Sequence, residues 1–267
     1  MSFPKNFLWG GATSASQYEG GYAIGGRGKS HLDYIRRVEK DDTDKTFPIN
    51  VTEEMYNDHK LHENEYNFAF RRGSDFYNRY KEDIALFAEL GFTTFNTTIS
   101  WARIFPHGVE GGVNQAGVEF YRNVFKECRK YGIDPVITLY KYDEPVYLEE
   151  TYGDWTNREM IHQFVEFAKV CFIEYKDLVN KWLTFNEINC ITALPYFAAG
   201  VVVRSEEEKL QQIYIAAHHE MIASAWATKI AHEINPKNKI GCMLAGGITY
   251  PYTCAPQDIW QAYEVDR

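Results

Sequence analysis

Short apolar segments alternate along the chain with longer segments of mixed polarity. Most of the short segments are rich in β-branched and aromatic residues, a composition typical of β-strands. The strands that they predict are residues 7–13, 93–100, 135–140, 181–185 and 240–245. Residues 34–72, which follow the first of these, show little periodicity and are predicted to form a long insertion that adds no strand.

The longer segments carry apolar residues at helical spacing. Two of them open on a capping box, in which a Ser or Thr is followed three residues later by a Glu: Thr156 with Glu159, and Ser205 with Glu208. Gly91 follows another segment as a helix C-cap. The helices predicted in this way are residues 74–90, 114–131, 156–175, 205–234 and 257–267.

Alternating strands and helices predict an α/β fold with parallel strands and right-handed crossovers. Two architectures compete, an open doubly wound sheet and a (β/α)8 barrel. Residues 28–30 (Gly-Lys-Ser) resemble the end of a phosphate-binding loop, but Ala23 stands where that loop needs its first glycine. Gln17, Asn186 and Glu187 lie at or just beyond the ends of predicted strands. Barrel enzymes keep their chemistry there, so the barrel is favoured.

The number of predicted strands is too small for a closed barrel. About five are found, whereas a barrel of this type closes with eight. We therefore predict that residues 1–267 form a single domain, the amino-terminal part of a (β/α)8 TIM-barrel type fold with only about its first five βα units.

Composition narrows the possible functions. With 267 residues, 45% of them hydrophobic and 24% charged, the chain can bury a large core. A net charge of -9 argues against a general nucleic-acid binder, because phosphate contacts need clustered Lys and Arg. No segment approaches the roughly 18 apolar residues of a membrane span, and no secretory signal is visible. The 16% aromatic content fits either a large aromatic core or, in part, a sugar-stacking surface.

Cysteine and histidine usage gives no sign of a metal or a disulfide framework. The five cysteines are odd in number, scattered and without a C-x-x-C pair, which favours a reducing cytoplasm. His218 and His219 with Glu220 could suggest a metal site. Adjacent helical residues point about 100° apart, however, unlike the pair in H-E-x-x-H, so we expect structural packing and no metal or cofactor.

The chemistry predicted for this chain centres on Glu187. It follows an apolar strand directly, and a carboxylate at the end of a barrel strand is a natural general acid or base. A lone Glu in such a place is more often a solvated carboxylate, so the wider sequence has to decide.

Several motifs, in order along the chain, carry a family resemblance. They are Phe-Leu-Trp-Gly-Gly-Ala-Thr-Ser-Ala over 7–15 with Gln-Tyr-Glu-Gly over 17–20, Ile-Ser-Trp-Ala-Arg-Ile-Phe-Pro over 99–106, Thr-Leu-Tyr over 138–140 with Asp143 and Pro145, and Thr-Phe-Asn-Glu over 184–187. Together they resemble glycoside hydrolase family 1, whose acid/base signature is similar to the last of them. His-His-Glu over 218–220, the segment 241–247 and Tyr-Pro-Tyr over 250–252 resemble its 6-phospho-β-glucosidase branch.

The resemblance implies hydrolysis of β-glycosidic bonds by a retaining mechanism, with 6-phospho-β-glucosides as the expected substrates. Glu187 would protonate the glycosidic oxygen and later deprotonate water. Gln17 would hold sugar hydroxyls, and Asn186 would bond to the 2-hydroxyl. Tyr142, where the family usually has tryptophan, would flank the sugar.

Two positions depart from the family pattern. Asn96 stands where the family has an arginine beside the nucleophile, and Lys141 where it has a histidine that contacts the sugar. An amide does not replace the planar fork of arginine. We take Lys141 as a substrate-binding position and form the hypothesis that it restores locally the positive charge lost at Asn96.

A retaining mechanism needs a second carboxylate, roughly 5–5.5 Å from the first. The family carries this nucleophile in a later Thr-Glu-Asn-Gly-like motif, which residues 1–267 lack. We therefore expect the chain alone to be inactive until a longer chain or a complementing C-terminal half supplies the nucleophile. A non-catalytic or vestigial sugar-binding protein, and a half-barrel that self-associates through its open edges and exposed apolar faces, stay open as alternatives.

Overall fold

The computed structural model describes residues 2–37 and 53–266. At its centre lies a parallel sheet of five strands, whose order in space is their order along the chain. Each strand therefore pairs with its predecessor through a crossover, as in the first part of a (β/α)8 barrel. The strands are β1 (Gly10–Ala12), β2 (Thr94–Thr98), β3 (Asp134–Tyr140), β4 (Lys181–Phe185) and β5 (Lys239–Gly241).

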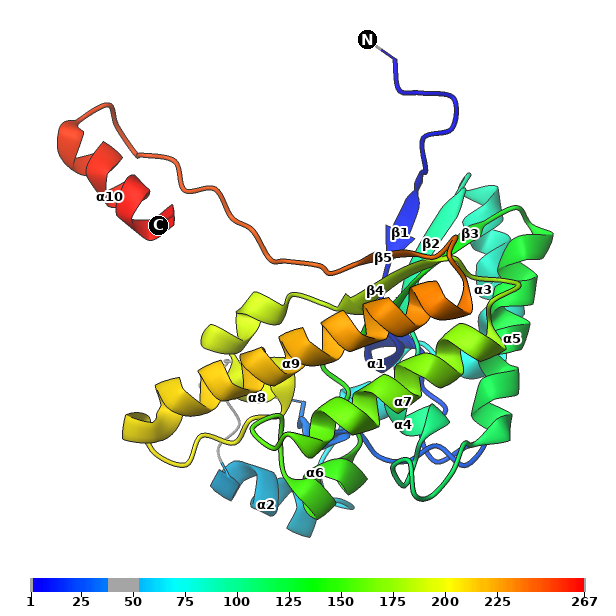
Figure 1. The fold of residues 1–267 in the computed structure, drawn as a ribbon, viewed down its shortest axis with the longest axis horizontal. Helices are drawn as coiled ribbons and strands as arrows, with labels where there is room; N and C mark the ends of the chain where they lie inside the picture. The colour runs from blue at the N-terminus through cyan, green and yellow to red at the C-terminus, as the bar shows by residue number, and fades with distance from the viewer. Residues whose placement is uncertain (1, 38–52, 267) are drawn as a thin grey trace.

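The crossover helices lie together on one side of this sheet (Figure 1). The long ones are α3 (Phe76–Glu89), α5 (Gln115–Lys130), α7 (Glu159–Glu174) and α9 (Glu206–Ile234). Shorter helices occupy the loops: α1 (Ala15–Tyr18), α2 (Glu53–Leu61), α4 (Trp101–Ile104), α6 (Val146–Tyr152) and α8 (Pro195–Ala199), with α10 (Pro256–Asp266) at the end of the chain. Three 3-10 turns, η1 (His31–Tyr34), η2 (Ala69–Arg71) and η3 (Ile188–Thr192), complete the described part.

Aromatic side chains form much of the core between sheet and helices. The rings of Trp101 and Phe167 stack with centroids 5.5 Å apart. Phe164 packs on Phe185 at 4.6 Å, which ties α7 to β4. All four side chains are buried. A large share of the aromatic content thus serves packing, which holds in place the strand that precedes Glu187.

The two predicted capping boxes have different outcomes. Ser205 caps α9 as predicted, because its Oγ accepts a hydrogen bond from the backbone N–H of Glu208 at 3.2 Å. The prediction of a capping box at Thr156 is wrong. Helix α7 begins only at Glu159, whose N–H donates to Asn157 Oδ1 at 2.9 Å. The N–H of Thr156 donates instead to Asp154 Oδ1 at 2.8 Å, so a turn forms where the first helical residues were predicted.

The predicted insertion 34–72 lies only partly within the described residues, because 38–52 fall outside them. Its described part contains α2 and η2, so a helix is present that the weak periodicity did not predict. In that part of the chain no strand is found, in agreement with the prediction. The assignment of residues 1–267 to a single domain stays a prediction.

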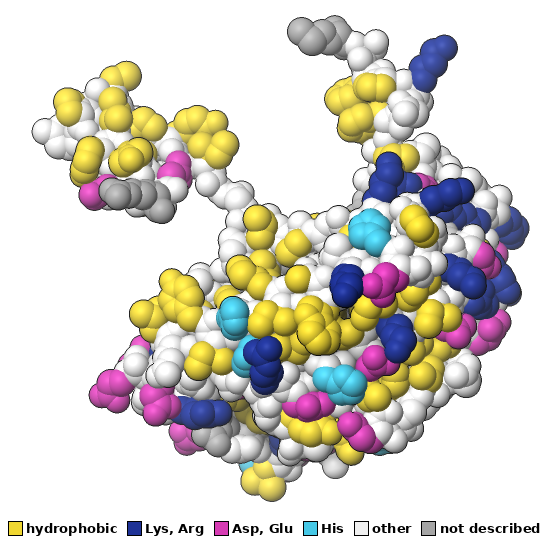
Figure 2. Space-filling view, viewed as in Figure 1, with side chains coloured by type: hydrophobic (Ala, Val, Ile, Leu, Met, Phe, Trp, Pro, Cys, Tyr) yellow, Lys and Arg dark blue, Asp and Glu magenta, His cyan; other side chains and the backbone are white. Residues whose placement is uncertain are grey.

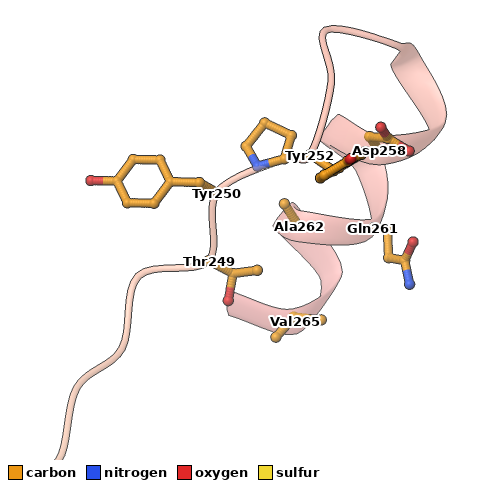
Figure 3. A pocket seen from close by; sticks show the side chains of 8 residues that line it. Thr249, Tyr250, Tyr252, Asp258, Gln261, Ala262 and Val265 are labelled. Carbon is orange, nitrogen blue, oxygen red and sulfur yellow. The ribbon is translucent and has the colours of Figure 1, made fainter.

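Residues 242–266 form a C-terminal arm, which stays hydrogen bonded to the chain after β4 at Met243 and Ala245, then runs away from the sheet and ends in α10 (Figure 1). Figure 2 shows apolar side chains gathered on this arm. Tyr252 is 97% exposed and Ile248 is 76% exposed. A pocket of about 190 Å³ between α10 and residues 249–252 (Figure 3) is built by the arm alone. It shares no lining residue with the site described next.

Candidate active site

The chain directly after β4 carries Asn186 and Glu187, and hydrogen bonds from both sides hold it. The N–H of Asn186 donates to the carbonyl of Tyr140 at the end of β3, at 2.9 Å. The N–H of Glu187 donates to the carbonyl of Met243, just beyond β5, at 2.7 Å. Glu187 therefore lies at the C-terminal edge of the sheet between two neighbouring strands.

Two non-glycine residues at this edge adopt left-handed backbone conformations. Tyr142 has φ 59° and Glu187 has φ 50°. Such conformations cost about 1–3 kcal/mol each and persist only where the surroundings impose them. The side chains of these two residues are directly hydrogen bonded to each other.

The hydroxyl of Tyr142 joins the two residues that follow β4. It donates to Glu187 Oε2 at 2.6 Å, and Asn186 Nδ2 donates to it at 3.0 Å. Burial, followed by the hydrogen bond to Glu187, raises the pKa of Tyr142, so the phenol keeps its proton. Three of the five predicted site residues thus form one connected chain of hydrogen bonds.

Lys141 and Cys190 complete the surroundings of Glu187. Burial lowers the pKa of Lys141, and the negative charge of Glu187 opposes that shift. The two groups are therefore close enough to attract each other. Cys190 Sγ lies 3.9 Å from Glu187 Oε2. Sequence reasoning missed Cys190, and the available signal was its position three residues after Glu187, at the spacing of one helical turn.

Gln17 lies apart from this cluster. Its side chain is exposed, and its Oε1 accepts a hydrogen bond from Ser14 Oγ at 2.8 Å. The start of α1 is fixed to β2, because the N–H of Ala15 donates to Thr98 Oγ1 at 2.7 Å. Gln17 is thus held at the same edge of the sheet, after β1, with β2 and β3 between it and the strand that precedes Glu187, and its side chain is exposed.

No second carboxyl group joins Glu187 in the contacts seen across the described residues. Its side chain bonds to Tyr142 and Cys190 and attracts Lys141. Asn96, at the position of the family arginine, directs its Nδ2 to the carbonyl of Val136 on β3 at 2.9 Å. The cluster is therefore equipped to donate and accept a proton at one carboxyl group and to bind a hydroxyl through the amide of Asn186, while Gln17 offers a second amide apart from the cluster.

Of the two adjacent histidines on α9, His219 is buried and serves packing, whereas His218 is exposed. His219 Nδ1 lies 2.9 Å from the carbonyl of Trp155 in a buried contact with the segment before α7. Over residues 2–37 and 53–266, no three His, Cys, Asp or Glu side chains are arranged to hold a metal ion. Nor is any helix in the same ranges long and apolar enough to cross a membrane.

A parallel sheet in chain order with polar residues at its C-terminal edge is the amino-terminal part of a (β/α)8-barrel enzyme fold. Residues 1–267 match the model of glycosyl hydrolase family 1, and the chain belongs to that family. It is 47% identical to the 6-phospho-beta-glucosidase AscB of Escherichia coli (strain K12), over 99% of this chain and 54% of the relative.

Other relatives are glucosidases too, and this chain again matches about half of their length. The identity is 44% with the aryl-phospho-beta-D-glucosidase BglH of Bacillus subtilis (strain 168), over 99% of this chain and 53% of that protein. The crystal structure of the rice Os3BGlu6 beta-glucosidase superposes with a TM-score of 0.78 at 29% identity, over 99% of this chain and 53% of the rice chain. The chain thus spans about half the length of the relatives it matches.

Proposed function

We propose that this chain contributes the acid/base half of a retaining β-glycosidase that acts on 6-phospho-β-glucosides. The observation that carries the proposal is Glu187, held directly after β4 by the hydroxyl of Tyr142 and by the bond from its own N–H to the carbonyl of Met243, just beyond β5. The substrate class rests on the relatives, which are phospho-β-glucosidases at 40–47% identity. Cytoplasmic location stays a prediction from the cysteine usage.

The reaction takes two steps at one carboxyl group of this chain. Glu187 donates a proton to the glycosidic oxygen while a carboxylate from outside residues 1–267 attacks the anomeric carbon. The same group, now ionised, then removes a proton from the water that releases the sugar. Asn186 and Gln17 bind hydroxyls of the sugar in both steps. Lys141 supplies a positive charge beside Glu187.

Complementation tests this assignment. The 267-residue chain is mixed with the separately produced carboxyl-terminal half of the Escherichia coli relative, and release of p-nitrophenol is followed from β-glucosides with and without a 6-phosphate. We expect no turnover by the chain alone and turnover of the phosphorylated substrate by the mixture. Glu187→Gln should abolish that turnover, whereas Glu207→Gln on the exposed first turn of α9 should not.

Two results would reject the proposal. One is full activity of the Glu187→Gln mixture. The other is turnover by the 267-residue chain alone, since that would require a nucleophile within it.

A non-catalytic sugar-binding role is the second candidate, favoured by Asn96 at the arginine position and by the lack of a carboxyl group among the contacts of Glu187. Titration with glucose 6-phosphate, followed by NMR, separates the two roles. Saturable binding near Asn186 and Tyr142 in a chain that complementation never activates supports this role over catalysis.

Self-association is the third alternative and concerns the C-terminal arm. Leu244, Ile248 and Tyr250 are each at least 66% exposed, and β1 and β5 form the two edges of the sheet. Unpaired strand edges and apolar surface favour association. Sedimentation of the chain with and without the complementing half distinguishes a self-associating half-barrel from one that is covered by its complement.

A further inference from the structure

The ring of Tyr142 is buried, and only its hydroxyl group reaches the site, which differs from the sugar-flanking ring that was predicted. Its side chain is 6% exposed, and its ring packs against Phe197 with centroids 4.9 Å apart. The hydroxyl group is the part that reaches the site, between Glu187 Oε2 and Asn186 Nδ2. The contact made by this residue is therefore a polar one.

When Glu187 is ionised, the hydrogen bonds among Asn186, Tyr142 and Glu187 can run in only one direction. A phenol has one proton to donate, and an ionised carboxylate can only accept. Tyr142 must then donate to Glu187, which leaves it to accept from Asn186. The orientation of the Asn186 amide follows from this chain, with Nδ2 toward Tyr142 and with Oδ1 accepting no hydrogen bond from the residues that the structure describes.

We propose that Tyr142 is the positioning residue of this site, fixing which atoms of Glu187 and Asn186 are available to the sugar. Oε2 of Glu187 is engaged by the phenol, so Oε1 is the oxygen left to carry the proton to the glycosidic bond. Oδ1 of Asn186 is the acceptor left for a sugar hydroxyl. The proposal rests on the proposed function for its sugar, but not for the hydrogen-bond chain itself.

The tryptophan that the family usually has here cannot play this part. An indole N–H donates and has no acceptor, so it could not receive the hydrogen bond from Asn186. Phenylalanine could do neither. Tyrosine is the aromatic residue that both accepts from an amide and donates to a carboxylate at one atom, so the role requires the hydroxyl and not only the ring.

A spectroscopic test reads the hydrogen-bond chain without any turnover. A hydroxyl proton in a hydrogen bond to a half-buried carboxylate, with the two oxygens 2.6 Å apart, exchanges slowly and resonates at low field, so the proton spectrum of the wild-type chain should contain such a signal. Tyr142→Phe should remove it, and the control Tyr147→Phe, at a partly exposed ring, should leave it unchanged. Asn186→Asp should shift it strongly, because two carboxylates then compete for one phenol proton.

The functional arm uses the complemented enzyme. We expect Tyr142→Phe to lower kcat about 10- to 100-fold, the range for loss of a hydrogen bond to a charged group, with little change in KM. Tyr142→Trp should show a similar loss, although it restores the family residue.

The outcomes distinguish the positioning role of Tyr142 from the proposed glycosidase reaction. A low-field signal that survives in Tyr142→Phe, or a folded Tyr142→Phe variant with wild-type kcat, overturns the positioning role. If Tyr142→Phe does not fold, an unchanged low-field signal in Asn186→Asp overturns it instead. Loss of the signal together with failure of complementation leaves this role intact and counts against the proposed reaction alone.

Discussion

Arg103 and Glu19 form a fully buried ion pair that fastens the loop after β1 to the helix after β2. Nε of Arg103 donates to Glu19 Oε1 at 2.6 Å, and the two side chains are 0% and 3% exposed. The guanidinium also donates to the carbonyl of Ile24 at 3.0 Å, and Tyr121 donates to the other carboxylate oxygen. This network holds the chain that directly follows Gln17.

Removing Arg103 should therefore destabilise the protein strongly. Arg103→Met leaves the Glu19 carboxylate buried without its partner, and we expect a loss of about 3–5 kcal/mol in the free energy of unfolding. Urea unfolding measures the change. Arg79→Met breaks an ion pair with Glu82 whose side chains are 55% and 70% exposed, and it should cost below about 1 kcal/mol. Equal losses in the two variants would contradict this.

The two capping sequences provide a second prediction. Ser205→Ala removes the acceptor for the N–H of Glu208 and should cost about 1 kcal/mol, since that N–H then lacks a protein partner. Thr156→Ala, at a matching sequence motif, should cost much less, because Asn157 and Asp154 already satisfy the local backbone. Thermal unfolding of both variants decides the matter. A larger loss in Thr156→Ala would show that its side chain does cap α7.

Much of the fold could be predicted from the chain because local signals and tertiary packing agree there. Strand β4 occupies residues 181–185 as predicted, since it has neighbours on both sides and is buried at three of its five residues. The first strand shrank from 7–13 to Gly10–Ala12. Strand β1 is at the edge of the sheet, and Phe7, Leu8 and Trp9 are 40–50% exposed. Hydrophobic pattern alone does not show where a neighbouring strand ends.

Part of the site could be predicted because it directly follows a strand that the sequence indicates. Asn186 and Glu187 could be found because they follow a strand directly. The hydrogen bond between Tyr142 and Glu187 joins residues 45 positions apart, and it depends on left-handed backbone at both, which no local motif indicates. The role of Arg103 was likewise hidden within a matched motif, because its partner Glu19 comes from a different βα unit.

Buried carboxyl groups should make stability fall as pH rises. Burial raises the pKa of Glu149 to about 7 and that of Glu144 and Glu220 well above the ordinary value. Between about 4.5 and 7 the folded chain holds the Glu149 proton that the unfolded chain has lost, so this contribution is full at low pH and disappears as pH rises through 7. His31 acts in the opposite sense below 6.5, since burial lowers its pKa to about 4.

The pH-dependent contributions of the buried carboxyl groups and of His31 to stability overlap. The informative comparison is therefore between the wild type and Glu149→Gln. Glutamine can still accept the hydrogen bond from Tyr56, which is 3.0 Å from Glu149 Oε2. We expect the variant to gain about 1–3 kcal/mol over the wild type at pH 8 and nothing at pH 4.5, measured by urea unfolding at intermediate pH values. Glu65→Gln, at an exposed carboxylate, should show no such pH-dependent gain. A constant difference would contradict the pKa assignment.

Lys141 and Asn96 lie at neighbouring strands, β3 and β2, and their joint departure from the family pattern can be tested by a double-mutant cycle. Asn96→Arg loses the bond to the carbonyl of Val136 and introduces a cation on β2, in the same sheet whose C-terminal edge carries Lys141 beside Glu187. We expect this single change to cost about 1–3 kcal/mol. If Lys141 replaces the missing charge, adding Lys141→His should recover more than about 0.5 kcal/mol of that loss.

The control for this cycle combines Lys141→His with Asn78→Arg, on the exposed face of α3, where the two changes should be additive. Additivity in both cycles means that the charge at 141 does not depend on the residue at 96. Coupling confined to Asn96 means that the two substitutions are linked through the site. Binding of glucose 6-phosphate, measured on the same four proteins of each cycle, should then show the same coupling, because the charge of Lys141 lies beside Glu187.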